Sequence, residues 1–167
     1  MAKIVFDVET VGQNFEALDD FSKEYFLKFA DTAEKTEEAK NSLSFYPLTA
    51  QIVTIGMLEV ETGRGFVYFQ NGNGPLEKFT EGQVDFISGD EKEILTCFWD
   101  RMNKYNQFVT FNGRVFDCPF VMLRSAMNHI RAAKNLMPYR YNYNLHIDLA
   151  DQLSFYEALR RRFSLHM

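Results

Sequence analysis

The chain begins with a short β-prone run that ends in two carboxylates separated by one residue. Residues 3–6 are mostly apolar, Asp7 and Glu9 follow them, and Thr10 closes the run. Because side chains two residues apart on a strand point to the same face, the pattern places the two carboxylates side by side. Carboxylates that close repel one another, and a hard divalent cation such as Mg²⁺ relieves the repulsion. A solvent-exposed strand that carries Asp and Glu by chance is the alternative interpretation of this pair.

A second β-prone run, residues 107–111, leads through a turn into a predicted helix. Asn112 and Gly113 form the turn, Asp117 precedes the helix, and Pro119 suits its first turn. Apolar residues then recur at helical spacing, at Phe120, Leu123, Met127 and Ile130. An acidic residue suits the positive end of a helix dipole, so an ordinary helix cap is one interpretation of Asp117. The other interpretation is a third carboxylate that is delivered to the first two.

Together these motifs resemble those of the DnaQ-like (DEDD) 3′–5′ exonucleases. Residues 6–10 resemble the first motif of that family, and Asn112, Phe116 and Asp117 resemble the second. The similarity is closest to the bacterial subgroup related to the exonuclease domain of family-B DNA polymerases, and it extends from residue 3 to about residue 165. Three longer segments carry it: residues 50–56, 110–124 and 146–154.

The resemblance implies an α/β protein with the ribonuclease H-like exonuclease fold, a mixed β-sheet flanked by helices. It implies hydrolysis of phosphodiester bonds from the 3′ end of a single strand, with DNA expected and RNA as the alternative. Two Mg²⁺ or Mn²⁺ ions are implied as cofactors, with Asp7 bridging both, Glu9 beside the attacking water and Asp117 on the second ion. Three residues are implied to contact the substrate, although Asn112 has turn closure as its alternative role: Thr10, Asn112 and Phe116.

The third motif of the family supplies a fourth carboxylate, and it has no clear counterpart in this chain. In the family this motif is Tyr-x₃-Asp or His-x₄-Asp on a late helix. His146 and Asp151 have the second spacing, but alternating apolar residues predict a strand over residues 143–149. The two residues would then straddle a strand–helix junction. Asp151, or less favourably Asp148, is the candidate fourth metal ligand, and a helix cap is the alternative for Asp151.

In the subgroup that this chain resembles, the third motif lies downstream of the segment similar to residues 146–165. We therefore expect a C-terminally incomplete exonuclease domain that binds divalent metal weakly and is a poor nuclease. Its last helix would lack a packing partner, which would favour self-association through exposed apolar residues. These residues are Leu159, Phe163 and Leu165.

The remaining pattern predicts one domain, residues 1–167, in which strands and helices alternate. Strands are expected at residues 51–60, 64–70, 107–111 and 143–149, and helices at 91–104, 117–131 and from Leu149 towards Phe163. Residues 76–89 show no clear pattern. A helical insertion at about residues 14–41 carries an apolar stripe at Leu18, Phe21, Tyr25, Phe29 and Ala33. We expect the insertion to pack on the sheet edge, and a cap over the carboxylates is the alternative.

The composition provides the material for a core, with 46% hydrophobic and 16% aromatic residues. A net charge of −5 argues against a general nucleic-acid coat protein, but it is compatible with an enzyme whose acidic site is neutralised by metals. The two cysteines fit no metal-ligand spacing, and the sequence shows neither a membrane-spanning run nor a signal-peptide layout. We therefore expect a cytoplasmic protein that has no membrane partner.

Two other functions fit parts of the pattern. A non-catalytic nucleic-acid-binding or interaction module on an exonuclease-like scaffold is the main alternative, because a fold does not determine an activity. Residues 139–143 interleave tyrosines with Arg140, which suits either stacking on bases or a solvated surface. A phosphatase-like Mg²⁺ hydrolase is a weaker alternative, since no phosphate-cradling glycine loop is evident.

Overall fold

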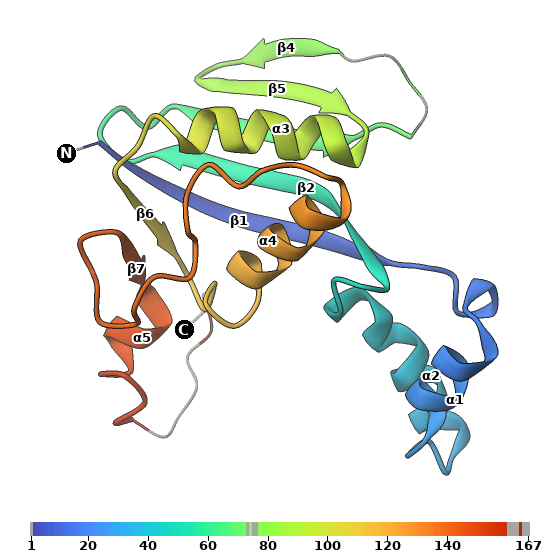
Figure 1. The fold of residues 1–167 in the computed structure, drawn as a ribbon. Helices are drawn as coiled ribbons and strands as arrows, with labels where there is room; N and C mark the ends of the chain where they lie inside the picture. The colour runs from blue at the N-terminus through green and yellow to red at the C-terminus, as the bar shows by residue number, and fades with distance from the viewer. Residues whose placement is uncertain (1, 73, 75–76, 160–163, 165–167) are drawn as a thin grey trace.

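The computed structural model describes residues 2–72, 74, 77–159 and 164, and its centre is a twisted, mixed β-sheet. Within these residues the sheet has the strand order β4-β5-β3-β2-β1-β6-β7 (Figure 1). Its strands are β1 (Lys3–Gly12), β2 (Ala50–Glu59), β3 (Gly65–Gln70), β4 (Lys78–Glu81), β5 (Val84–Gly89), β6 (Gln107–Thr110) and β7 (His146–Asp148).

The strand directions identify the architecture. β1, β2 and β3 form an antiparallel meander, whereas β6 runs parallel to β1 and β7 runs parallel to β6. The sheet is mixed, because the parallel strands β6 and β7 extend an antiparallel meander on the free side of β1. The prediction of an α/β fold with a mixed sheet flanked by helices is therefore confirmed.

Two helices, α3 (Glu91–Met102) and α4 (Asp117–Met127), lie over one face of the sheet (Figure 1). α3 begins with a capping box in which Asp90 and Glu93 satisfy each other's backbone N–H groups. Its buried face packs on β1, where the Phe6 ring lies 5.2 Å from that of Phe98. The indole Nε1–H of Trp99 donates a hydrogen bond of 2.8 Å to Ser125 Oγ and so ties α3 to α4.

The segment without a clear sequence pattern, residues 76–89, contains the β4–β5 hairpin. Gly82 takes a φ of +58° in the turn, a conformation that glycine adopts without steric cost. The Phe79 and Phe86 rings stack at 4.8 Å across the two strands. All four residues of β4 are exposed, so the strand has no buried alternation that a sequence pattern could reveal.

The C-terminal elements are shorter than the sequence predicts. The strand expected at residues 143–149 is β7, and the helix that follows, α5 (Leu149–Leu153), ends long before Phe163, which lies outside the described residues. The prediction of a long helix is wrong within the described range. Phe155, Tyr156 and Glu157 all have positive φ angles, between 52° and 70°, which a right-handed helix does not allow. Contacts with the preceding loop hold this bend: the rings of Tyr141 and Tyr156 lie 4.7 Å apart, and Arg140 pairs with Glu157 at 2.8 Å.

The insertion between β1 and β2 forms four short helical pieces at one end of the sheet (Figure 1). They are η1 (Phe15–Ala17), α1 (Asp20–Leu27), α2 (Ala33–Asn41) and η2 (Ser42–Phe45). α1 and α2 bury no residue, and Phe21 and Phe29 are 79% and 80% exposed, so the prediction that the insertion packs on the sheet edge is wrong for these two helices. Only η2 returns to the sheet, where Leu43 is buried.

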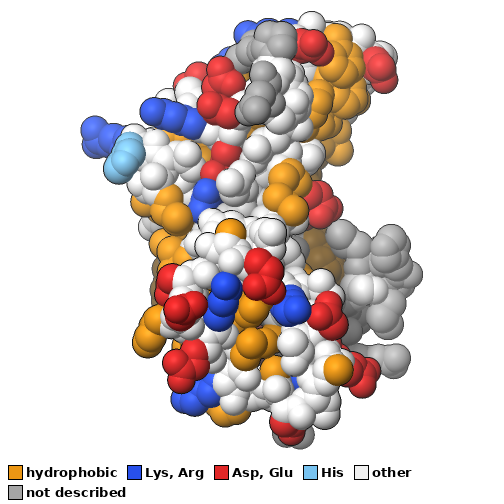
Figure 2. Space-filling view, turned by 90° about the vertical axis from the view of Figure 1, so that its right-hand side faces the viewer, with side chains coloured by type: hydrophobic (Ala, Val, Ile, Leu, Met, Phe, Trp, Pro, Cys, Tyr) orange, Lys and Arg blue, Asp and Glu red, His pale blue; other side chains and the backbone are white. Residues whose placement is uncertain are grey.

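Viewed from the insertion end, the surface mixes hydrophobic, acidic and basic side chains (Figure 2). Orange hydrophobic patches in the lower part of this view are surrounded by red and blue charged groups. Across the described part of the chain, no helix combines the length and the hydropathy that crossing a membrane requires.

Candidate active site

The end of β6 brings Asp117 against the middle of β1. The parallel pairing of β1 with β6 stops at Val5 and Val109, after which the chain turns into α4. Asp117 is the first residue of α4, and its Oδ1 accepts a hydrogen bond of 3.0 Å from the backbone N–H of Val8. The Asp117 carboxylate therefore lies beside β1 at the point where β6 has ended.

Asp7 and Asp117 form a pair of interacting carboxyl groups. Asp117 is only 3% exposed, whereas Asp7 is exposed to solvent. Burial raises the pKa of Asp117 to about 7, and the nearby charge of Asp7 contributes to the rise. Across the described residues, neither side chain forms an ion pair with Lys, Arg or His. The pair is thus a site of unbalanced negative charge.

Glu9 follows Asp7 on the same side of β1. Phe6 and Val8 are buried, whereas Asp7 and Glu9 are exposed, as the alternation of a strand requires. In the part of the chain that the structure describes, however, no group of three or more His, Cys, Asp or Glu side chains is arranged to hold a metal. The structure thus brings Asp7 and Asp117 together, and the convergence of Glu9 with them stays a prediction.

Asp148 braces the turn that leads into α4. It is 4% exposed, and its carboxylate accepts hydrogen bonds from the backbone N–H groups of Asn112 at 2.8 Å and Arg114 at 2.9 Å. It also caps α5 by accepting a bond of 3.0 Å from the N–H of Ala150. Asn112 has a φ of 60°, so its backbone closes the turn as the sequence alternative proposed. These bonds give Asp148 a structural role, and its assignment as a metal ligand stays untested.

Asp151, the other candidate for the fourth carboxylate, is paired with a cation of the protein. Arg140 donates to both of its oxygens, through Nε at 3.0 Å and a terminal nitrogen at 2.5 Å. The same guanidinium binds Glu157, so Arg140 is engaged by two carboxylates rather than free to hold a phosphate. The role of Asp151 as a metal ligand is likewise untested.

His146 is buried in β7 and is separate from Asp151 in α5, as the predicted strand–helix junction requires. Its ring stacks on Phe108 at 4.3 Å, and burial lowers its pKa to about 4. Nδ1 lies 3.2 Å from the guanidinium of Arg114, and Nε2 lies 2.8 Å from Thr110 Oγ1. Because the Arg114 guanidinium can only donate, Nδ1 must accept, and Nε2–H then donates to Thr110 Oγ1. The His146 imidazole is therefore neutral, and both of its nitrogens are used in structural contacts.

A buried ion pair fixes α4 against α3 and β2. Arg124 binds both oxygens of Glu91, at 2.8 Å and 2.5 Å, and both side chains are 8% exposed. Glu91 also accepts a bond of 2.9 Å from the backbone N–H of Ile52, and Arg124 donates at 2.9 Å to the carbonyl of Pro47. The helix that carries Asp117 is therefore anchored to β2 and to the segment that follows the insertion.

The predicted substrate-contacting residues Thr10 and Phe116 both meet η2. Thr10 Oγ1 donates a hydrogen bond of 2.7 Å to the carbonyl of Ser44, and the Phe116 ring lies 6.3 Å from that of Phe45. Phe45 is 65% exposed, and no sequence pattern selects it because it lies far along the chain from either acidic motif. Only the tertiary fold places it there.

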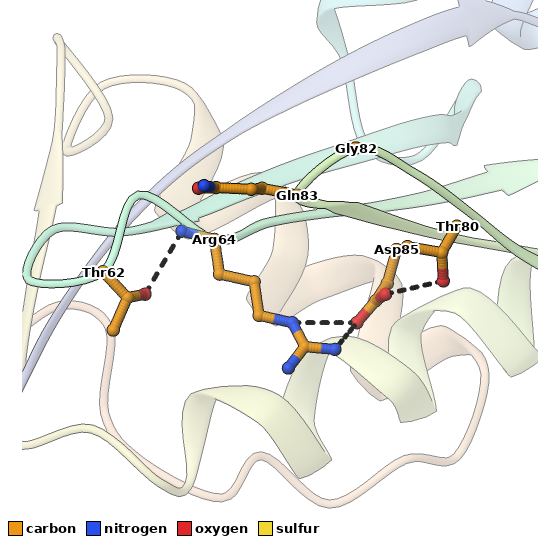
Figure 3. Close-up of a pocket in the computed structure, with 6 residues that line it drawn as sticks. All are labelled: Thr62, Arg64, Thr80, Gly82, Gln83 and Asp85. Atoms are coloured by element: carbon orange, nitrogen blue, oxygen red, sulfur yellow. Dashed lines mark hydrogen bonds and ion pairs between the residues drawn. The ribbon is translucent and has the colours of Figure 1, made fainter.

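A separate pocket lies on the opposite half of the sheet, between the start of β3 and the β4–β5 hairpin (Figure 3). Arg64 binds Asp85 at 2.6 Å, and Thr80 donates to the same carboxylate at 2.9 Å. Its other lining residues are Thr62, Gly82 and Gln83. The charges in this pocket are balanced, in contrast to those of Asp7 and Asp117.

Comparisons with known proteins cover most of the chain. A family model described as "Predicted 3'-5' exonuclease related to the exonuclease domain of PolB" matches residues 45–167. One similar solved structure is the family B DNA polymerase from the hyperthermophilic archaeon Pyrobaculum calidifontis, with 15% identity and a TM-score of 0.49. That similarity covers 92% of this chain and 16% of the polymerase chain, and no curated protein matches the sequence. Because the family model matches well over half of its residues, the chain belongs to the predicted 3′–5′ exonucleases related to the exonuclease domain of PolB.

Proposed function

We propose that this chain hydrolyses phosphodiester bonds from the 3′ end of a single nucleic-acid strand, with DNA as the expected substrate, and that divalent metal ions bind at Asp7 and Asp117. The observation that carries the proposal is the charge interaction between these two carboxyl groups, one exposed and one buried. The family match supports the reaction class.

The residues fit a hard divalent cation. Asp7 and Asp117 interact, and no Lys, Arg or His of the described residues forms an ion pair with either. Two such neighbouring carboxyl groups are stabilised in their charged forms when a cation joins them. Carboxylate oxygens are the ligands that Mg²⁺ and Mn²⁺ prefer. In this proposal Glu9 supplies a third carboxylate from the same side of β1.

The chain's own residues would position the substrate and the ligands. When bound, the metal ions supply an activated water and neutralise charge on the leaving 3′-oxygen. The Val8 N–H fixes the orientation of Asp117. Asp148 holds the turn before α4, and the Glu91–Arg124 pair holds the helix itself, so the carboxylate is held in place before substrate arrives.

A cleavage assay tests the proposal. A 5′-labelled single-stranded oligonucleotide incubated with Mn²⁺ or Mg²⁺ should shorten stepwise from its 3′ end, and EDTA should stop the reaction. Asp7→Asn and Asp117→Asn should abolish shortening, and Glu9→Gln should reduce it. Asp100→Asn makes the same change of charge at an exposed position of α3 and should leave the rate unchanged. Metal-independent cleavage, or cleavage by Asp117→Asn at the original rate, would overturn the proposal.

One observation favours the alternative of a non-catalytic nucleic-acid-binding module. Within the described residues no third carboxylate joins Asp7 and Asp117 in a metal-binding arrangement. A module of this kind would retain labelled single strands in a binding assay but would leave them intact with either metal. The cleavage assay therefore separates the two functions directly.

A further inference from the structure

The helical pair α1–α2 of the insertion presents three aromatic residues to solvent. Phe21 and Tyr25 lie one turn apart on α1, and Phe29 follows its last turn; the three residues are 79%, 66% and 80% exposed. Neither helix buries a residue. A single exposed aromatic is ordinary, but three at helical spacing form an apolar stripe, and such a stripe marks a surface that binds another apolar face.

The stripe is held by two capped helices. The side chain of Asp19 caps α1 by accepting a bond of 2.9 Å from a backbone N–H, and Thr32 caps α2 in the same way at 3.2 Å. The Phe26 ring lies 5.4 Å from that of Tyr46, which ties α1 to the segment that returns to β2. Isolated helices shorter than about 12 to 15 residues are marginal in water, and α1 and α2 have 8 and 9 residues. The pair therefore gains stability from any further helix that packs on its stripe.

The charges of the insertion are unbalanced in one direction. Residues 14–41 carry eight Asp or Glu and four Lys. Three of the lysines pair with carboxylates of the insertion itself, at N–O distances from 2.7 to 3.8 Å, and the fourth, Lys28, lies 5.4 Å from the centroid of the Phe29 ring. Figure 2 shows acidic groups in red around the orange patches at this end of the molecule. Within the residues that the structure describes, four carboxylates of α1 and α2 form no ion pair: Asp20, Glu24, Glu34 and Glu38.

The combination of apolar stripe and excess negative charge selects the kind of partner. The unpaired carboxylates repel the phosphates of a nucleic acid and the anionic headgroups of a membrane. A second copy that offered the same stripe would bring two sets of these carboxylates together. A protein segment that carries Lys or Arg beside apolar side chains fits both features, because its apolar groups cover the aromatic rings while its cations pair with the carboxylates.

We propose that the α1–α2 pair is a docking surface for a cationic amphipathic helix of another protein. The apolar side chains of that helix pack on Phe21, Tyr25 and Phe29, and its Lys or Arg side chains pair with the four carboxylates that lack an ion pair. A helix bound in this way places its apolar anchors at positions i, i+3 or i+4, and i+7. The inference goes beyond the proposed function, because it assigns the insertion a role in attaching the domain to a basic protein partner.

Binding of a synthetic peptide tests the surface. The probe is a peptide of about 18 residues, long enough to form a helix, with Leu at positions i, i+3, i+4 and i+7 and Lys elsewhere. It should bind the full chain in a fluorescence-anisotropy titration, and a peptide of the same composition in scrambled order should bind at least about tenfold more weakly. Phe21→Ala combined with Phe29→Ala should lower the affinity for the probe at least about tenfold. Tyr139→Ala combined with Phe155→Ala, which removes two comparably exposed rings outside the insertion, should leave the affinity unchanged.

Two further measurements locate the bound peptide. Glu24→Gln combined with Glu34→Gln should weaken binding and reduce its dependence on salt. Glu81→Gln combined with Asp100→Asn makes the same change of charge at exposed positions outside the insertion and should do neither. The bound peptide should slow amide hydrogen exchange in α1 and α2 and leave exchange in α3 unchanged.

Three results would overturn the docking surface. The first is a probe that does not bind, or that binds the Phe21→Ala and Phe29→Ala double variant as tightly as the wild type. The second is self-association, measured by sedimentation velocity, that this double variant loses, since a second copy would then cover the stripe. The third is binding of a labelled single-stranded oligonucleotide that the same variant loses. None of these measurements depends on strand cleavage, so failure of the docking surface and failure of the proposed function are distinguishable.

Discussion

Asp117 Oδ1 accepts a hydrogen bond of 3.0 Å from the backbone N–H of Val8, and this bond fixes the first residue of α4 to the middle of β1. The same carboxyl group contacts Asp7, so the bond also determines how close two acidic groups lie. A buried carboxyl group held against another by the backbone costs stability in the metal-free protein. This cost leads to predictions that do not depend on measuring nuclease activity.

Asp117→Asn should stabilise the metal-free protein. The amide oxygen can still accept the bond from Val8, while the charge that burial and Asp7 disfavour is removed. At pH 8 in EDTA the free energy of unfolding should rise by on the order of a few kcal/mol, as measured by urea denaturation. A variant less stable than the wild type would show that the contact with Asp7 is not repulsive.

The gain from Asp117→Asn should depend on pH in a defined direction. Because the folded-state pKa of Asp117 is raised to about 7, the stability that its protonated form contributes is fully present below pH 4 and is lost as the pH rises to 7. The difference between variant and wild type should therefore be small near pH 4, grow towards pH 7 and stay constant above it. A difference that is independent of pH would contradict this account.

Asp148→Asn should have the opposite effect on stability. The two oxygens of Asp148 accept three backbone N–H bonds, and an amide has only one oxygen with which to accept them. Loss of at least one buried acceptor should lower the free energy of unfolding by about 1–3 kcal/mol in EDTA. If Asp148 were instead a metal ligand in an unbalanced acidic site, its neutralisation would stabilise the metal-free protein.

The Glu91–Arg124 pair should be essential to the position of α4. Arg124→Met leaves a buried, uncompensated carboxylate and should lower stability by about 3–5 kcal/mol, whereas adding Glu91→Gln to it should recover part of the loss. The exposed pair of Arg64 and Asp85 is a matched control, for which Arg64→Met should cost less than about 1 kcal/mol. Similar losses at the two pairs would contradict the anchoring role.

His146 should remain neutral at pH values well below the usual pKa of a histidine side chain. Its pKa is lowered to about 4 by burial, so the stability that depends on its neutral form is present above pH 6.5 and is lost as the pH falls towards 4. An NMR titration should show no protonation of His146 between pH 7 and pH 5. His146→Gln, which cannot be protonated in this range, should lose less stability than the wild type over the same interval.

The sequence was informative where hydrophobic periodicity and turn chemistry agree. The apolar spacing of α3 and the position of Pro119 in the first turn of α4 predicted both helices closely, although α4 ends at Met127, with His129 at a φ of 57°. The hairpin at residues 78–89 was missed because β4 is exposed on both faces and lacks alternation.

The packing of the insertion and the length of the last helix were mispredicted, although the insertion is helical as expected. Phe21 and Phe29 have helical spacing, yet the helices that would bury them project from the sheet and leave them exposed. The last helix ends where Tyr156 and Glu157 are held by the preceding loop. Helical periodicity in a sequence records what a segment could bury and not whether a partner is present.

For the site, strand alternation and the cap position of Asp117 left two interpretations open, and the resemblance to the exonuclease motifs favoured a shared site for Asp7 and Asp117. The partners of Asp148 and Asp151 could not be predicted, because backbone N–H groups and Arg140 reach them only through the tertiary fold. Phe45 is a similar case, since its contact with Phe116 joins residues far apart in the chain.

The central claim, that Asp7 and Asp117 form a divalent-cation site, is tested most directly by calorimetric titration of Mn²⁺ at pH 8. We predict that the wild type and Asp100→Asn bind Mn²⁺ with the same affinity. Asp7→Asn and Asp117→Asn should each lower the Mn²⁺ affinity at least tenfold, which corresponds to about 1.4 kcal/mol of binding free energy. Equal Mn²⁺ affinity in the wild type and Asp117→Asn would contradict the claim.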